Sequence, residues 1–176
     1  MTNRGIRPIA AVPAAFVISL LVLTACSSGG TKNSGPPLTK DQFITRANAI
    51  CASTTTQIQN GAKTVFPNVN QIGEQDADKI VKFTRSIVVP ALQKMHDDIA
   101  SLKSPSADSS FIDKMLSDLQ NGLNKWHDDP TLTGTITDKS LTTFDAEAND
   151  FGLKTCAQVD GVTRAIAGGN PYITTP

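Results

Sequence analysis

Hydrophobic residues recur at steps of three and four along most of this chain, which is the period of an α-helix with one buried side. The first such stretch begins at Thr39, and Gln42 three residues later completes a capping box that predicts a helix start. Pro67 predicts its end, because proline cannot continue a helix from within. The predicted buried side consists of Phe43, Ala47, Ile50, Thr54, Ile58 and Val65.

A second stretch of the same period predicts a helix from about Glu74 to Leu102. Pro90 lies inside it, and we expect a kink there, since proline removes one backbone hydrogen bond and crowds the preceding turn. The β-branched run 87–89 resembles a strand locally. The helical period continues on both sides of that run, so we interpret the whole segment as a helix.

Two further helices are predicted in the second half of the chain. The short connection 104–106 predicts that the third helix returns antiparallel to the second and ends near Pro130. The fourth helix is marked by apolar positions from Leu141 to Phe151 and is stopped near Gly152. We therefore predict an all-α fold, an antiparallel four-helix bundle over residues 39–160, followed by a C-terminal tail over 161–176.

The N-terminus has the three-part pattern of a secretory signal peptide over residues 1–25. Arg4 and Arg7 supply its positive start, and Pro13 interrupts the apolar run, which leaves an uninterrupted h-region of about ten residues. A membrane-spanning helix needs about 20 apolar residues, so this run is short for a permanent span. The small residues Thr24 and Ala25 suit a peptidase that cleaves after them.

The four residues Leu23-Thr24-Ala25-Cys26 resemble the lipobox of bacterial lipoproteins. That resemblance implies a diacylglyceryl group on the Cys26 sulfur, fatty acyl chains such as palmitate, and cleavage that leaves Cys26 first in the mature chain. Two acyl chains give stable anchoring where one is marginal. The implied location is the extracytoplasmic face of the cell membrane, with membrane lipid as partner. The alternative is an ordinary cleaved signal followed by a chance cysteine.

Residues 26–38 are predicted to be a lipidated N-terminus and a flexible tether, because Ser, Gly, Pro, Asn, Lys and Thr predominate there. The whole chain has 16 basic and 16 acidic side chains, and removal of the leader takes away two arginines. No basic stripe with interleaved aromatic residues is present, which argues against a nucleic-acid partner. The sequence identifies neither a protein partner nor a small ligand.

The chain has three cysteines, so lipidation of Cys26 leaves Cys51 and Cys156. An exported protein meets an oxidising compartment, and an even count then predicts a Cys51–Cys156 disulfide. A metal-binding pair and two free thiols are the alternatives. Neither has sequence support, since no C-x-x-C motif is present and no histidine lies near either cysteine.

Two short segments carry a second resemblance. Residues 46–51 (Arg-Ala-Asn-Ala-Ile-Cys) and 151–156 (Phe-Gly-Leu-Lys-Thr-Cys), with a hairpin about Ser104-Pro105 between them, are similar to those of small actinobacterial secreted or lipid-anchored helical proteins. In that group an A-x-A-I-C segment near the start pairs with a G-L-x-x-C segment near the end. The resemblance implies a disulfide-tied bundle and implies no activity.

Both histidines occur in a repeated L-x-K-apolar-H-D-D pattern, over 92–98 and 123–129. The predicted antiparallel register places His96 opposite Lys114 and His127 ~20 Å further along, too far for one shared metal. Consecutive His-Asp-Asp positions also fan around a helix rather than converge. We predict a polar surface patch and no metal site within one chain; a metal held across a dimer is the alternative.

No catalytic motif is present, so we predict no enzyme, no catalytic residue and no cofactor. Asp145, Glu147 and Asp150 are predicted to form a solvated face of the fourth helix. The predicted function is a non-enzymatic, membrane-anchored binding or interaction module of the cell envelope. The alternative is a carrier of a small ligand, lipid or haem, with a cavity between helices. A hydrolase with a Ser/His/Asp cluster formed only in three dimensions ranks last.

Overall fold

The structure, a computed structural model, describes residues 36–68, 76–134 and 137–167. These residues all belong to one compact unit, Lys32–Pro176. Within the described ranges the chain forms helices and turns and no strand. The predicted all-α class is therefore confirmed, while the predicted signal peptide and Cys26 lie outside the described residues.

The first helix, α1, spans Lys40–Val65 and begins as predicted. The Gln42 backbone N–H donates to the Thr39 hydroxyl at 3.3 Å, and the Thr39 N–H donates to the Gln42 side-chain oxygen at 3.1 Å. This reciprocal pair satisfies donors that the first turn of a helix leaves without a partner. Phe66 caps the other end, directly before the predicted stop at Pro67.

The second predicted helix is divided into three parts. Helix α2 spans Ala77–Phe83, a wide π-helical turn η3 spans Thr84–Val88, and helix α3 spans Val89–Ala100. The wide turn lies immediately before Pro90, whose ring would clash with the carbonyl four residues earlier in a regular α-helix. The irregularity predicted at Pro90 is thus a π-helical turn, and the β-branched run is helical.

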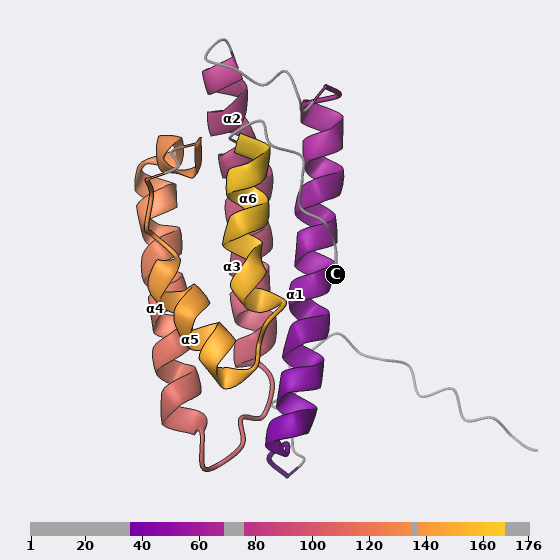
Figure 1. The fold of residues 1–176 in the computed structure, drawn as a ribbon, viewed down its shortest axis with the longest axis vertical. Coiled ribbons are helices and arrows are strands. Elements are labelled where there is room, and N and C mark those ends of the chain that lie inside the picture. Colours follow the sequence, from indigo (N-terminus) through magenta and orange to yellow (C-terminus); the bar gives the residue numbers. More distant parts are fainter. Residues whose placement is uncertain (1–35, 69–75, 135–136, 168–176) are drawn as a thin grey trace, which may run out of the picture. The chain divides into compact units, whose positions relative to one another are not determined.

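Helix α4 spans Ser109–Asp128 and runs antiparallel to α3 (Figure 1), as predicted. Gln93 of α3 donates a side-chain hydrogen bond to Gln120 of α4 at 3.0 Å. In the predicted register His96 lies opposite Lys114. The contact between Gln93 and Gln120 indicates a register that differs from the predicted one by about one helical turn. A 3₁₀ turn, η4, follows at Pro130–Gly134.

Helix α5 spans Thr142–Phe151 and ends at Gly152, whose φ of 101° is left-handed. Glycine adopts this conformation without the steric cost that a Cβ brings, which explains the predicted stop. The Leu153 N–H then donates to the Ala148 carbonyl at 2.7 Å, completing the turn that closes α5.

The predicted tail over 161–176 is wrong in its first part. A 3₁₀ turn η5 at Cys156–Gln158 leads into helix α6, Val159–Ala167. Val159, Val162 and Thr163 are buried, because α6 packs against α1. The predicted domain boundary at residue 160 therefore falls inside a helix; residues 168–176 lie outside the described residues.

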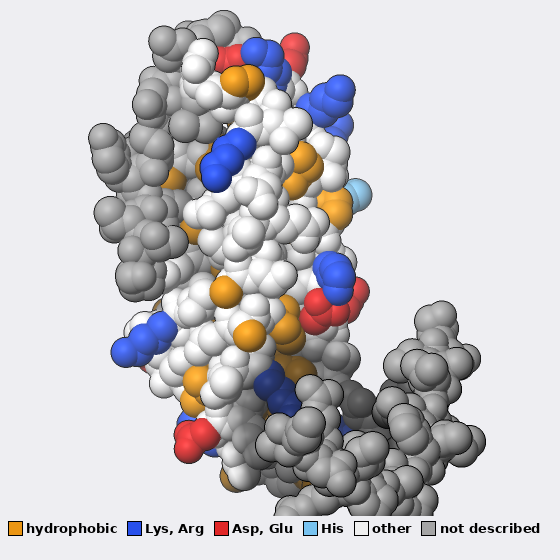
Figure 2. Space-filling model, turned by 90° about the vertical axis from the view of Figure 1, so that its right-hand side faces the viewer, with side chains coloured by type: hydrophobic (Ala, Val, Ile, Leu, Met, Phe, Trp, Pro, Cys, Tyr) orange, Lys and Arg blue, Asp and Glu red, His pale blue; other side chains and the backbone are white. Residues whose placement is uncertain are grey.

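The helices enclose one core. Helix α3 contacts both α1 and α4. Of the two C-terminal helices, α5 contacts α4 and α6 contacts α1, so together they cover one side of the group formed by α1, α3 and α4 (Figure 1). On the face shown in Figure 2, Lys and Arg side chains are scattered rather than gathered. The largest fully buried side chains are those of Phe43, Ile58, Leu92, Met95, Ile99, Ile112, Met115, Leu119, Leu123, Trp126, Leu141 and Phe144.

Candidate functional site

The Cys51–Cys156 disulfide joins α1 to η5, with the two Cα atoms 5.0 Å apart. Both cysteines are completely buried within the core. The predicted pairing is therefore confirmed, and the alternatives of a metal pair or two free thiols do not describe these residues. Cys26, the predicted lipidation site, lies outside the described residues.

Asn48 fixes the chain between α5 and the disulfide. Its side-chain N–H donates to the Gly152 carbonyl at 3.2 Å, and its side-chain oxygen accepts from the Thr155 backbone N–H at 3.0 Å. One amide side chain thus satisfies two backbone groups that no helix pairs. Cys51 lies about one turn after Asn48 in α1. By holding the chain just before Cys156, Asn48 therefore places Cys156 beside Cys51.

The two histidines do not converge on one site. His96 is largely covered and its ring nitrogen contacts the Asp97 carboxylate at 2.9 Å, whereas His127 is exposed and lies 3.4 Å from the Asp128 carboxylate. Each histidine therefore interacts with the residue that follows it. Among the described residues, no group of three or more His, Cys, Asp or Glu side chains is arranged to hold a metal ion.

A surface hollow of about 370 Å³ lies where the predicted tether enters the domain. We call it the tether-exit hollow. The Leu38 backbone N–H donates to the Lys103 carbonyl at 3.1 Å and so holds the entering chain against the connection between α3 and α4. The residues that line it are Pro36, Pro37, Leu38, Gln42, Arg46, Leu102 and Lys103.

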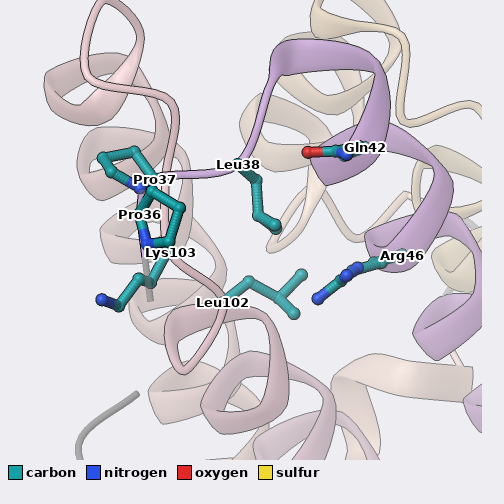
Figure 3. A pocket seen from close by; sticks show the side chains of 7 residues that line it. All are labelled: Pro36, Pro37, Leu38, Gln42, Arg46, Leu102 and Lys103. Atoms are coloured by element: carbon teal, nitrogen blue, oxygen red, sulfur yellow. The ribbon is translucent and has the colours of Figure 1, made fainter. Parts of the chain in front are cut away.

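The tether-exit hollow has one basic side chain directed into it (Figure 3). Arg46 extends from α1 toward Leu102. Leu38 and Leu102 supply its apolar side. No described residue makes a hydrogen bond or ion pair with Arg46. The neighbouring Lys40, in contrast, is paired with Asp108 at 3.6 Å. The hollow therefore combines an apolar lining with a guanidinium group that is open to an anion.

Two carboxylates meet between α5 and α6, the half-buried Asp145 and the buried Asp160. Desolvation, with the nearby charge of Asp160 and a hydrogen bond to it, raises the pKa of Asp145 to about 8. Asp160 is 2% exposed and forms an ion pair with Arg164 one turn later. One oxygen of each carboxyl is buried without a donor from the described residues. Like charges this close disfavour ionisation of both carboxyl groups, so Asp145 keeps its proton to a higher pH than an ordinary aspartate does.

The prediction of a solvated acidic face on α5 is therefore partly wrong. Asp145 faces Asp160, and Glu147 is covered and pairs with Lys114 of α4. Hydrogen bonds to Asp118 and then to Glu147 raise the pKa of Lys114 to about 12. Only Asp150 is exposed as predicted. The helical period places these residues correctly along the helix, but it does not reveal that α6 and α4 cover two of them.

A second buried polar group fixes the loop before α5. The Trp126 indole N–H donates to Asp138 at 2.7 Å, and the other oxygen of Asp138 accepts from the Ser140 hydroxyl at 2.7 Å and backbone N–H at 3.1 Å. These contacts satisfy a buried indole and both carboxylate oxygens. We assign this group a structural role, because its bonding capacity is used within the domain.

A second hollow of about 250 Å³ is lined by Arg85, Val89 and His127. It lies at the surface between η3, the start of α3 and the end of α4, and has no core residue in its lining. The predicted alternative of a ligand carrier calls for a cavity between helices. Both hollows described here are open at the surface and neither is an enclosed cavity, and the carrier function stays a prediction.

Comparison with protein-family models, with curated proteins and with solved structures found no match to this chain. Among the described residues, no helix is both long enough and apolar enough to cross a membrane. Functional interpretation therefore rests on the residues themselves.

Sequence reasoning missed two features of this domain. The Asp160–Arg164 pair has the i, i+4 spacing of a helical ion pair, which was a signal for α6. Arg46 belongs to the segment 46–51 that carries the resemblance to small helical lipoproteins, but nothing local in the sequence places it beside Leu102. Only the packing of α1 against the end of α3 creates the tether-exit hollow.

Proposed function

We propose that this protein is a lipid-anchored, extracytoplasmic binding module of the cell envelope and not an enzyme. The observation that carries the proposal is the buried Cys51–Cys156 disulfide. Structural disulfides are typical of proteins exported to oxidising compartments. This feature is independent of the leader sequence, yet it favours the same compartment as the lipobox at Leu23–Cys26.

The anchor is proposed to be Cys26, modified by a diacylglyceryl group. Two acyl chains would hold the protein stably at the membrane, with about 0.8 kcal/mol for each buried methylene. Pro36, the first described residue, lies ten positions after Cys26 in the sequence. The domain would thus be presented close to the outer surface of the membrane.

The non-enzymatic part of the proposal rests on how the reactive side chains are used. His96 and His127 each interact with the aspartate next to them, and Asp145 and Asp160 interact between α5 and α6. Each of these side chains therefore has its partner within the domain. We further propose that α1, the α2–α3 segment, α4, and α5 with α6 form the antiparallel four-helix arrangement; the contacts of α5 with α4 and of α6 with α1 support it.

The anchor is tested by expressing the full chain in a bacterial host with a lipoprotein pathway and labelling with an alkyne-tagged palmitate. We expect label and membrane localisation for the wild type and for Ser27→Ala, and neither for Cys26→Ala. Intact mass would show a chain that begins at Cys26, carries lipid and gains two hydrogens on reduction. Unlabelled wild-type protein recovered in the medium would overturn the anchor. Turnover of a substrate by the purified protein would overturn the non-enzymatic assignment.

A further inference from the structure

We propose that the tether-exit hollow binds the phosphate of an anionic phospholipid headgroup in the membrane that carries the Cys26 anchor. This inference rests on the anchoring part of the proposed function. The shared chemistry is a phosphate oxygen held by a guanidinium group. A free phosphate ion would present the same oxygens, so the test below separates the two sources.

The position of the hollow favours a membrane ligand. Its wall begins with Pro36 and Pro37, which lie ten and eleven residues after Cys26. Ten residues of fully extended chain span at most about 35 Å. The hydrogen bond from Leu38 to Lys103 fixes the point at which this chain reaches the domain. Of the described residues, those that begin the wall of the hollow are therefore the nearest to the proposed anchor along the chain.

The side chains of the hollow match a headgroup and the glycerol region beneath it. Arg46 presents a planar, permanently charged group whose donors fit phosphate oxygens in pairs. Gln42 can add a second kind of donor. Its side-chain oxygen accepts the hydrogen bond from the Thr39 N–H, and this bond leaves the side-chain NH₂ group to donate to a ligand. Leu38 and Leu102 offer apolar surface beside the charge (Figure 3). A phospholipid has both a phosphate group and an apolar part that can contact the two leucines, whereas inorganic phosphate has no apolar part to contact them.

A second observation at the same end of the domain supports membrane contact. Phe111, at the start of α4, is the one large hydrophobic side chain that is exposed among the described residues, at 38%. It stacks on Phe151, and the Lys40 ammonium lies 4.2 Å from the centre of the Phe151 ring. Aromatic rings and cationic side chains together are typical of surfaces at the membrane–water interface.

The test uses the chain from Ser27 to Pro176, which retains the whole described unit and lacks the acyl anchor. Its disulfide and cooperative unfolding are verified first. Dihexanoyl phosphatidylglycerol is then titrated below its micelle concentration, and binding is followed by isothermal calorimetry. We expect saturable binding that Arg46→Gln weakens by at least about tenfold. Arg85→Gln, which alters the second hollow, serves as the matched control and leaves the Kd unchanged.

Further probes and variants make each outcome decisive. Dihexanoyl phosphatidylcholine is expected to bind at least about tenfold more weakly than the anionic lipid, and inorganic phosphate likewise. Arg46→Lys keeps the charge without the paired donors and is expected to be intermediate. Binding of phosphate as tight as that of the anionic lipid would make this a site for free anions and overturn the membrane ligand. Lipid binding that Arg46→Gln leaves unchanged would overturn the site itself. Because this chain lacks Cys26, failure here is distinct from failure of the palmitate labelling experiment.

Discussion

The side-chain oxygen of Asn48, in α1, accepts a hydrogen bond from the backbone N–H of Thr155, although 107 residues separate them in the sequence. The same side chain donates to the Gly152 carbonyl. Helix α1 therefore holds the turn after α5 by side-chain hydrogen bonds as well as by the disulfide. The local segment Gly152–Thr155 depends on a residue from the other end of the domain.

We expect Asn48→Ala to lower the free energy of unfolding by about 1–3 kcal/mol, because it leaves two partly buried backbone groups without partners. Chemical denaturation followed by circular dichroism measures this change. The control is Asn124→Ala, whose side chain makes only an exposed bond to Gln120 within α4. Equal effects of the two substitutions would show that the Asn48 contacts contribute nothing specific.

Reduction of the Cys51–Cys156 disulfide is expected to lower the free energy of unfolding by about 2–5 kcal/mol. The bond joins residues 105 positions apart. In the chain-entropy model, a disulfide that closes a longer loop stabilises the fold more, because it removes more conformational entropy from the unfolded chain. Urea denaturation with and without a reductant measures the difference. The Cys51→Ala/Cys156→Ala double variant should match the reduced protein. An unchanged midpoint after complete reduction would contradict the prediction.

Two glycines should respond oppositely to alanine. A Cβ on Gly122 of α4 would lie 2.5 Å from the Ser140 carbonyl oxygen, so Gly122→Ala forces the loop before α5 away and should cost about 1–3 kcal/mol. A Cβ on Gly161 of α6 meets nothing within 4 Å, and Gly161→Ala should stabilise by about 0.5–1 kcal/mol through helix propensity. Thermal unfolding of both variants tests this pair. Destabilisation by Gly161→Ala would argue against α6.

The half-buried Asp145 predicts a loss of stability toward alkaline pH. Its pKa is raised to about 8 in the folded protein, from an ordinary value of 3.8. Between these values the folded state binds more protons than the unfolded state, so the free energy of unfolding decreases as pH rises. The contribution is fully present below pH 4 and is lost progressively up to about pH 8.

Asp145→Asn should remove this pH dependence, because the amide stays neutral. From pH 5 to pH 9 we expect the Tm of the wild type to fall relative to the Tm of the variant. The expected fall is on the order of 3 °C for each kcal/mol lost from the free energy of unfolding. Thermal scans at pH 5, 7 and 9 measure it. Asp150→Asn, on the exposed side of the same helix, is the control and should follow the wild type. Parallel curves for wild type and Asp145→Asn would contradict the raised pKa of Asp145.

Features that depend on neighbouring residues could be predicted from the sequence. The start of α1 follows from Thr39 and Gln42, and the end of α5 follows from Gly152, because capping and left-handed turns are local chemistry. The pairing of Cys51 with Cys156 followed from counting cysteines in a chain that the sequence predicts to be exported. The hairpin between α3 and α4 followed from a short connection.

Features decided by tertiary packing could not be predicted in this way. Val159, Val162 and Ile166 have helical spacing, but nine residues form a helix only marginally without a partner, and α1 provides it. The burial of Asp145 likewise depends on α6. Arg46 and Leu102 belong to different helices, so the tether-exit hollow follows only from how α1 and α3 pack together. The predicted lipidation of Cys26 stays a prediction.

The bond between α1 and η5 has a mechanical consequence for a protein held by its N-terminus. If Cys26 anchors the protein as proposed, tension would enter the domain at Pro36 and travel along α1 as far as Cys51. From there the covalent link would transmit the load directly to Cys156. Pulling on the two ends of the domain could therefore extract only the part of α1 before Cys51 and the helix α6 after Cys156. The residues between the two cysteines cannot be drawn out while the bond is intact, so the position of a single cross-link shields most of the domain from unfolding under load.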